Sequence, residues 1–446
     1  MDAERARRLS FVARPGSTPL RIARAEGAWL YTEEGQAILD ASGGAIVANV
    51  GHGRREVAEA YARELEKASY LLPPFATESR LRLVERLVQR WLPAGLTRVA
   101  FTSGGSESVD AALRVVRAHH LAAGRPGRWK VIGRDLSYHG TTLATLAVGG
   151  HTKRRAGYEP WLPDLPKAPA CYCWRCPLGK TYPSCGVQCV DEIETAILRA
   201  GPDTVAAVIA EPIGGSTAGA LVPPDEYWPR LAEICRRHGV LLIADEVMTG
   251  FGRTGKKFAV DHWGTTPDIL VGGKGLTGGY APMGAVFARE EVVEPIAAAG
   301  QELMFFTYSA HPASCAAADR VLQILEREAL VARAATMGEK LGKRLSRLLA
   351  HPNVGDVRGR GLLWAVELVA DKATREPFEA SAKLTEKVVA AGIANGIFVY
   401  PGGVDPARDV ITLGPPFTIS EQEIEMIGER LERAIESAVA RVHERH

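Results

Sequence analysis

The sequence predicts an α/β fold with a mainly parallel sheet that helices cover on both faces. Short, continuously apolar runs such as TVAAVIA (204–210) and GVLLIA (239–244) recur through the middle of the chain, and helical patterns separate them. A strand without polar alternation is buried on both faces, which is typical of parallel sheets. The polar residues of this region follow the strands directly, at the edge where such sheets bind ligands.

The central elements follow in a regular series. The strands are expected at 98–103, 129–133, 204–210, 239–247, 268–273 and 283–288, with helices at 106–120 and 227–238. A long irregular insertion, rich in Pro and Cys, separates the second strand from the third. The alternation of strand and helix indicates one large domain, for which we expect residues 61–319.

After about Pro312 the pattern changes to helices at 316–326 and 330–350, followed by the alternating stretch DVRGRGLLWAVEL. Such alternation suits a smaller antiparallel sheet. A final amphipathic helix runs from Glu421 towards His446. We expect a smaller C-terminal domain at 320–446, joined by an N-terminal segment, 1–60, whose GAWLYTEEGQAILD predicts a hairpin around Glu34-Gly35.

The overall composition excludes several classes of function. The 446 residues carry a net charge of +2, with 46% hydrophobic and 24% charged residues, so nothing favours a nucleic-acid partner. No apolar run approaches the roughly 20 residues that cross a bilayer. The N-terminal MDAERARRLSFVARPGS lacks the apolar core of a secretory signal, so we read it as mature sequence and expect a cytoplasmic protein.

Five of the seven cysteines lie close together in the irregular insertion: Cys171, Cys173, Cys176, Cys185 and Cys189. Their spacing lacks the paired C-x2-C units of a convincing zinc ribbon. We therefore interpret them as reduced thiols in a loop and expect no metal. A zinc-binding protein that uses the Cys171–Cys189 cluster remains a remote alternative.

Two residues at strand ends carry the chemistry. Asp245 ends an apolar strand, where a carboxylate needs a cationic partner such as a protonated ring nitrogen, although a salt bridge or a helix cap would also explain it. Lys274 follows another apolar strand among glycines, which leave room for a planar group; alone it could be a surface lysine. Together they match pyridoxal 5'-phosphate (PLP), which needs an amine for an imine and a carboxylate beside its ring nitrogen.

The other parts of such a site are also present. Gly104, Gly105 and Ser106 immediately precede a helix, whose N-terminus favours a phosphate through free N–H groups and the helix dipole, although simple capping is an alternative. Tyr138, next to His139, offers an aromatic face for a pyridine ring, but it could equally be a core residue.

These motifs stand in the order FTSGGSES, YHG, AEPI, LLIADEVMTGFGRTGK, GGKGLTGGYAPMGA and FTYSAHPASCAAA. In that order the sequence resembles, over almost its whole length, the class III aminotransferases, the ω-amino-acid and ornithine-type group of fold-type I PLP enzymes. The resemblance implies a seven-stranded sheet in the large domain, a smaller α+β C-terminal domain, and a homodimer or dimer of dimers with active sites between subunits. It also implies transamination from an amine or ω-amino acid to a 2-oxo acid such as pyruvate or 2-oxoglutarate.

The resemblance assigns roles to individual residues. Gly105 and Ser106 would hold the phosphate, Tyr138 and Val247 would enclose the ring, and Asp245 would pair with its nitrogen. Lys274 would carry the cofactor and shuttle the proton. Three further residues are expected at the cofactor: His139, Glu211 and, from the neighbouring subunit, Thr307.

The substrate pocket departs from the ornithine-type pattern. Relatives of that type carry an Arg just before a Pro-Pro pair, and this sequence has Thr412 there, which favours a likeness to ω-transaminases. Arg408 is a candidate carboxylate partner or simply an exposed loop residue, and Phe75 and Tyr400 are candidate pocket residues. A PLP aminomutase or a decarboxylating aminotransferase would use the same Lys and Asp, and a PLP-binding module without activity is a further alternative.

Overall fold

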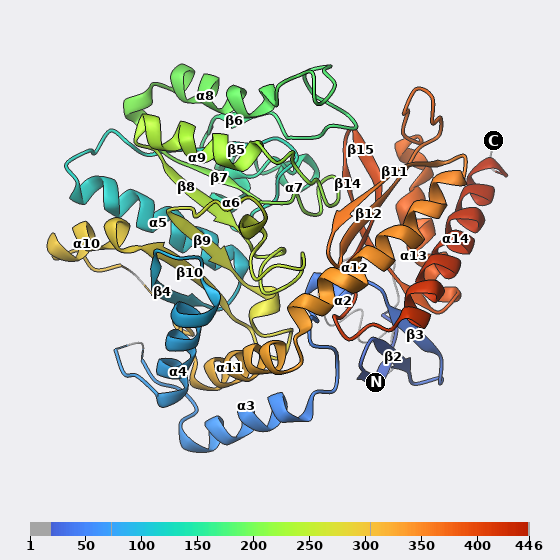
Figure 1. Ribbon diagram of the computed structural model, residues 1–446, viewed down its shortest axis with the longest axis horizontal. Helices are drawn as coiled ribbons and strands as arrows, with labels where there is room; N and C mark the ends of the chain where they lie inside the picture. Colours follow the sequence, from blue (N-terminus) through green and yellow to red (C-terminus); the bar gives the residue numbers. More distant parts are fainter. Residues whose placement is uncertain (1–18, 73, 304, 445–446) are drawn as a thin grey trace.

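The large sheet has seven strands in the order β4-β10-β9-β8-β7-β5-β6 (Figure 1). The computed structural model describes residues 19–72, 74–303 and 305–444. The strands are β4 (Leu96–Thr102), β5 (Lys130–Arg134), β6 (Lys167–Ala168), β7 (Val205–Ala210), β8 (Leu241–Asp245), β9 (Ile269–Gly272) and β10 (Gly284–Arg289). The strands from β9 to β6 pair in parallel, whereas β10 is antiparallel to both neighbours. The predicted mainly parallel, seven-stranded sheet is confirmed.

Helices cover both faces of this sheet. Helices α5 (Gly105–Ala122) and α10 (Glu290–Ala298) pack on one face, and α8 (Gln188–Ala200) and α9 (Tyr227–His238) pack on the other. All six side chains of β7 are buried, which explains why its sequence shows no polar alternation. Each buried Val or Ile contributes about 1.5–3 kcal/mol relative to an exposed one, so the covered sheet contributes strongly to the stability of the fold.

A smaller antiparallel sheet lies beside the large one, in the order β11-β12-β15-β14 (Figure 1). Its strands are β11 (Val354–Arg360), β12 (Leu363–Leu368), β14 (Tyr400–Val404) and β15 (Ala407–Leu413). Helices α12 (Leu330–Ser346), α13 (Leu384–Ala394) and α14 (Glu421–His443) pack with it and with one another. The alternating stretch thus forms β11 and β12, as the sequence predicts.

The N-terminal strands join the C-terminal half of the chain. Strands β1 (Ile22–Glu26), β2 (Trp29–Thr32) and β3 (Ala37–Asp40) form an antiparallel ribbon, and β3 pairs in parallel with β13 (Ile397–Phe398). The hairpin around Glu34-Gly35 is therefore present. Residues 1–18 lie outside the described residues, and the domain boundaries at 60 and 319 remain a prediction.

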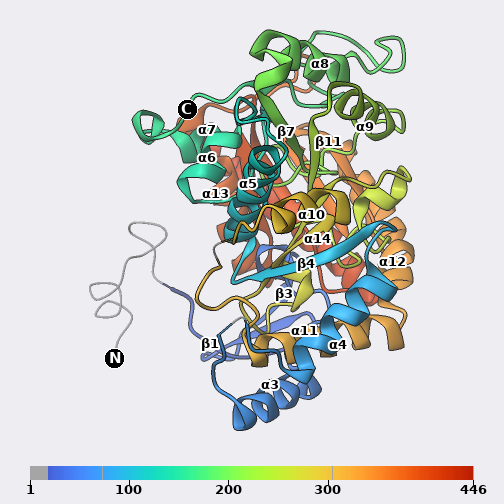
Figure 2. The same cartoon turned by 90° about the vertical axis from the view of Figure 1, so that its left-hand side faces the viewer.

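Among the remaining helices, α3, α4 and α11 lie below the large sheet in Figure 1, where α11 packs against the other two. They are α2 (Gly43–Ile46), α3 (Arg55–Lys67), α4 (Glu78–Arg86), α6 (Leu143–Val148), α7 (Thr152–Arg155) and α11 (Pro312–Arg327). Figure 2 shows α3, α4 and α11 together at one end of the molecule. In the part of the chain that the structure describes, no helix combines the length and apolar character of a membrane span.

One detail of the insertion differs from expectation. Cys189 was expected in an irregular loop, but it lies in the first turn of α8. Buried residues at Val190, Ile193 and Ile197 give this segment a helical period that begins inside the cysteine cluster. The loop expectation was therefore wrong for Cys189.

Candidate active site

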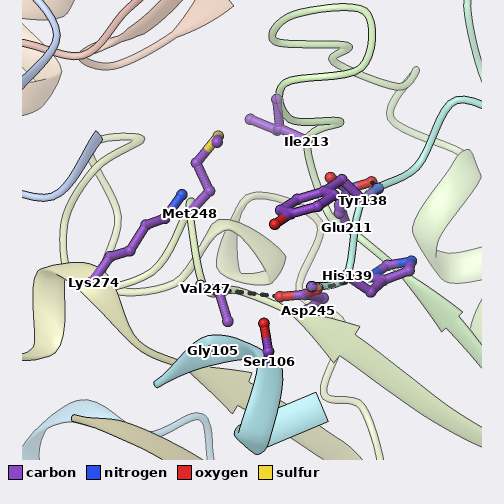
Figure 3. A pocket seen from close by; sticks show the side chains of 11 residues that line it. Gly105, Ser106, Tyr138, His139, Glu211, Ile213, Asp245, Val247, Met248 and Lys274 are labelled. Carbon is purple, nitrogen blue, oxygen red and sulfur yellow. Dashed lines mark hydrogen bonds and ion pairs between the residues drawn. The ribbon is translucent and has the colours of Figure 1, made fainter. Parts of the chain in front are cut away.

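A cavity of about 170 Å³ opens where the parallel strands of the large sheet end (Figure 3). The residues that line it come from the segments after β5, β7, β8 and β9 and from the first turn of α5. They are Gly105, Ser106, Tyr138, His139, Gly140, Glu211, Ile213, Asp245, Val247, Met248 and Lys274. The sheet therefore assembles at one edge groups that are up to about 170 positions apart in the chain.

Asp245 is the last residue of β8 and is 5% exposed. One carboxylate oxygen lies 2.7 Å from Nδ1 of His139, and the other accepts a hydrogen bond of 3.1 Å from the Val247 backbone N–H. His139 is buried, and its Nε2 has no partner among the described residues. These contacts fix the direction in which the carboxylate faces the cavity.

Lys274 lies across the cavity from Asp245 and starts a single turn of 3-10 helix, Lys274–Leu276 (Figure 3). Its φ of 41° is left-handed, an unusual conformation for a residue with a side chain. The dashed bonds in Figure 3 connect His139, Asp245 and Val247 but none reaches Lys274. Burial lowers the pKa of the Lys274 amine to about 8, although the Asp245 and Glu211 carboxylates oppose that shift. The amine is thus available as a nucleophile near neutral pH.

The first turn of α5 forms the floor of the cavity in Figure 3. Its N–H groups have no acceptor within the helix, so this end favours an anion. A Cβ at Gly105 would approach Cγ1 of Val247 to 2.8 Å, so glycine keeps the backbone close to the cavity. The Ser106 hydroxyl accepts a hydrogen bond of 3.1 Å from the Thr141 backbone N–H.

Glu211 and Tyr138 lie together on the wall of the cavity opposite Lys274 (Figure 3). The Glu211 carboxylate accepts hydrogen bonds from the backbone N–H groups of Gly215, at 3.0 Å, and Tyr138, at 3.4 Å. Burial raises the pKa of Glu211, while His139 and Arg134 act in the other direction. Glu211 therefore holds the backbone of Tyr138 in place, and the Tyr138 ring faces the cavity (Figure 3).

The comparisons with known proteins fit this geometry. The family model described as aminotransferase class-III matches residues 11–435. The chain belongs to the class III aminotransferases. It is 38% identical over 442 residues to an uncharacterized aminotransferase of Schizosaccharomyces pombe, covering 96% of this chain and 95% of that protein.

Two other relatives have more informative names. A putrescine–pyruvate aminotransferase of Pseudomonas aeruginosa is 36% identical over 430 residues, covering 94% of this chain and 91% of that one. A solved (S)-enantioselective ω-transaminase of Thermomicrobium roseum superimposes with a TM-score of 0.91 at 38% identity, covering 98% of both chains. The predicted family and fold are confirmed.

The cofactor of this aminotransferase is PLP, as in its family, and the cavity suits it. Three features of the cavity match three groups of PLP. The reactive amine suits the aldehyde, the carboxylate held in a fixed direction suits the ring nitrogen, and the helix N-terminus suits the phosphate. Gly105 and Val247 both line the cavity, and they pack so closely that a Cβ on Gly105 would lie 2.8 Å from Val247. The roles of individual residues in binding PLP remain our proposal.

The low pKa of Lys274 predicts how cofactor capture depends on pH. Only the neutral amine attacks an aldehyde, so the capture rate of the apoenzyme should rise about tenfold per pH unit below the pKa. It should level off above about pH 8. Stopped-flow absorbance after mixing apoenzyme with PLP measures this rate. A rate that still climbs steeply between pH 9 and 10 would show that the amine has its ordinary pKa.

Gly105 and Gly104 make a matched pair for testing the phosphate end. Gly104 does not line the cavity; it caps α5 with an extended backbone, and a Cβ there would meet nothing within 4 Å. We expect Gly105→Ala to weaken PLP binding about tenfold because the new methyl group collides with Val247. Gly104→Ala should change it less than about threefold. Equilibrium dialysis of PLP against the two apoenzymes distinguishes the outcomes, and equal losses would contradict the assignment.

Several predicted residues lie outside this cavity. Thr307 is exposed in a turn, and the side chain of Phe75 is 64% exposed. Tyr400 and Arg408 line a second, larger cavity of about 720 Å³. The Thr412 side chain is fully buried in β15 and does not line the first cavity.

Sequence reasoning also missed residues that do line the site. Ile213 and Met248 supply apolar wall, and each stands within two positions of a residue that we predicted, Glu211 or Val247. Their place in the same strand-end loops is the signal that could have found them. An apolar side chain by itself carries no chemical signature, so the pattern did not distinguish them from core residues.

The five clustered cysteines differ in how far they are buried. Cys171 is buried, Cys173 is exposed, and the other three are partly buried. Within the described ranges, no group of three or more His, Cys, Asp or Glu residues is arranged to hold a metal ion. The family assignment replaces the alternative of a zinc-binding protein.

Proposed function

We propose that the chain transfers the amino group of an amine or an ω-amino acid to a 2-oxo acid such as pyruvate or 2-oxoglutarate. The observation that carries this proposal is the absence of a guanidinium group among the residues lining the described cavity. A fixed arginine there would favour one carboxylate-bearing donor, and an unpaired one would be costly when an uncharged amine binds. Thr412 stands in its place in the sequence, and Val247, Met248 and Ile213 leave an apolar wall.

The residues of the site divide the chemical work. Bound PLP supplies an electrophilic carbon and a ring that withdraws electrons. The Lys274 amine would take a proton from the amine-bearing carbon of the donor and would then give that proton to the carbon on the other side of the same nitrogen. Asp245 presents its charge to the ring nitrogen, and His139 keeps that carboxylate in position. The first turn of α5 holds the phosphate, and Tyr138 and Val247 confine the ring.

Relatives support pyruvate as the first acceptor to test. The Pseudomonas aeruginosa relative is named for putrescine and pyruvate, which are a diamine and a 2-oxo acid. We infer the same class of acceptor here. We expect the range of donors to be wider than the range of acceptors, because the apolar wall of the cavity does not require a second charged group on the donor.

We also propose that the protein works as a homodimer. Apolar side chains are exposed near the turn that contains Thr307: Tyr70, Leu72, Phe75, Leu303, Phe305 and Tyr308. The Tyr70 and Tyr308 rings lie 6.2 Å apart, so these two segments form one surface. An exposed apolar face of this kind is typical of a subunit interface, and it would bring Thr307 to the site of the second copy. Sedimentation of the holoenzyme at twice the chain mass of 48.0 kDa would support this.

A donor screen of the holoenzyme tests the proposed function. The visible absorbance of the bound cofactor should bleach with putrescine, 4-aminobutyrate, β-alanine or 1-phenylethylamine and return when pyruvate is added. Alanine should accumulate in step with the carbonyl product of the donor. Turnover of one substrate without an acceptor, or release of CO₂, would instead indicate an aminomutase or a decarboxylating enzyme.

A further inference from the structure

The segment between α2 and α3 contacts the turn that carries Lys274. Asn49, which lies in this segment, is 1% exposed. Its side-chain amide nitrogen donates a hydrogen bond of 2.9 Å to the backbone carbonyl of Gly275, the residue immediately after Lys274. The same nitrogen donates a longer bond, of 3.4 Å, to the Phe251 carbonyl. A single buried amide therefore joins the Lys274 turn to the loop that follows Asp245 and β8.

The Asn49 amide is itself held in a fixed place. Its Oδ1 accepts a hydrogen bond of 2.9 Å from the Val50 backbone N–H. The backbone N–H of Asn49 donates to the Val47 carbonyl at 2.8 Å, and its backbone carbonyl accepts from the Phe417 N–H, also at 2.8 Å. The nitrogen and the oxygen of the Asn49 side chain are thus both bonded, as a buried amide requires.

Two glycines of the Lys274 turn give the Asn49 amide room. A Cβ at Gly275 would lie 3.0 Å from Nδ2 of Asn49, and a Cβ at Gly278 would lie 2.8 Å from Oδ1. Gly278 also has a φ of 59°, which favours glycine. Part of the glycine-rich stretch GGKGLTGG is therefore explained by its contact with Asn49.

The Lys274 backbone needs support because its φ of 41° is strained for a residue with a side chain. Such strain costs about as much as one buried hydrogen bond contributes, so a single neighbouring bond can decide the conformation. The Lys274 carbonyl accepts from the Thr277 and Gly278 N–H groups at 3.2 and 3.1 Å, but these bonds lie within the turn. The bond from Asn49 comes from 226 positions earlier in the chain, so it fixes the turn relative to the rest of the site.

We propose that Asn49 is a positioning residue for Lys274. By holding the Gly275 carbonyl, the Asn49 amide keeps the Lys274 backbone left-handed, and the backbone conformation limits the directions that the side chain can take. This inference rests on the proposed function, because it concerns the amine that carries the cofactor, but it does not depend on which donor or acceptor is used. Without the Asn49 amide the turn is free to relax to a negative φ, which moves the amine from its place across the cavity from Asp245.

A second attachment between the same two segments provides a matched control. The Tyr280 hydroxyl donates a hydrogen bond of 2.8 Å to the Gly51 carbonyl and accepts one of 2.6 Å from the Arg54 backbone N–H. Tyr280 stands six positions after Lys274, so its hydroxyl acts at the far end of the turn. Tyr280→Phe therefore removes two hydrogen bonds to the same segment without releasing the Lys274 backbone.

The experiment measures the limiting rate at which each apoenzyme captures PLP, by stopped-flow absorbance at high PLP concentration and at about pH 9, where the Lys274 amine is mostly neutral. We expect Asn49→Ala to slow capture about 10- to 100-fold, because a misdirected amine seldom meets the aldehyde in a reactive geometry. Tyr280→Phe should change the rate less than about threefold while it lowers Tm by a similar amount. Asn49→Ser, whose hydroxyl is one atom shorter than the amide, should behave like Asn49→Ala.

Thermal unfolding of the same apoenzymes separates positioning from a general loss of stability. If Asn49→Ala and Tyr280→Phe slow capture equally for an equal loss of Tm, or if Asn49→Ala captures PLP at the wild-type rate, the proposal is overturned. Asn49→Ser supplies the same comparison where Asn49→Ala does not fold. The measurement uses no substrate, so a wild-type protein that captures PLP but transaminates no donor would contradict the proposed function and leave the role of Asn49 to be decided by the capture rates alone.

Discussion

Lys274→Ala should abolish transamination almost completely, with kcat reduced about 10⁴-fold or more. The variant loses both the amine that reacts with the aldehyde and the base that moves the proton, and in Figure 3 no other amine lies among the residues drawn in the cavity. The fold should survive, because the side chain lines an open space and makes none of the bonds drawn there. Steady-state rates with 1-phenylethylamine and pyruvate measure the loss.

Borohydride treatment of the wild-type holoenzyme provides the control. Peptide mapping should place a reduced pyridoxyl group on Lys274 and none on Lys167. Lys167 is a suitable comparison because burial also lowers its pKa to about 8, yet its amine is bonded to the Ala147 carbonyl and lies outside the cavity. An adduct found elsewhere, with none on Lys274, would refute the assignment of the cofactor-bearing residue.

Asp245→Asn should reduce kcat about 10²- to 10³-fold while PLP remains bound. The substitution keeps the shape of the side chain but removes the negative charge that we propose faces the ring nitrogen. Without that charge the ring withdraws electrons less strongly, so the proton on the donor carbon is harder to remove. Single-turnover bleaching of the cofactor absorbance by 1-phenylethylamine measures this step directly.

Asp268→Asn is the matched control for Asp245. Asp268 immediately precedes β9, whereas Asp245 ends the neighbouring parallel strand β8. The two carboxylates therefore lie at opposite ends of these adjacent strands. Asp268 accepts a hydrogen bond of 2.8 Å from the Leu242 backbone N–H, and its substitution should lower Tm without slowing the single-turnover step. If both variants slow that step equally, Asp245 acts through the stability of the sheet and not through the cofactor.

Much of this site could be predicted because its signals are local. Asp245 and Lys274 each follow an apolar strand directly, and the rule that parallel strands present their carboxyl ends at one edge brings such residues together. Gly105 and Ser106 were found in the same way, from the start of a helix that follows a strand. Met248 and Ile213 belong to these loops too, but apolar residues carry no signal that separates a pocket wall from a core.

Other parts depend on contacts between segments that are distant in the chain. Arg154 was not singled out in the sequence, where it is one of three consecutive basic residues in an insertion; only the structure shows that its guanidinium lies over the Tyr138 ring. Arg408 was also a candidate, and only the structure shows its ion pair with Asp405. Phe75 is aromatic, as many pocket residues are, but its side chain is exposed.

By itself, the sequence determined the family, the order of the strands and helices along the chain, and the two residues to which we assign the chemistry. The family follows from the ordered motifs that resemble class III aminotransferases, and the other features follow from hydrophobic periodicity and from polar groups at strand ends, which are properties of short segments. Only the tertiary structure decided that β10 runs antiparallel within the sheet, that His139 orients Asp245, and which arginine near the site is left unpaired. Those outcomes depend on how separate segments pack, because the charge and hydrogen-bonding state of a side chain are set by neighbours that the chain brings from far away.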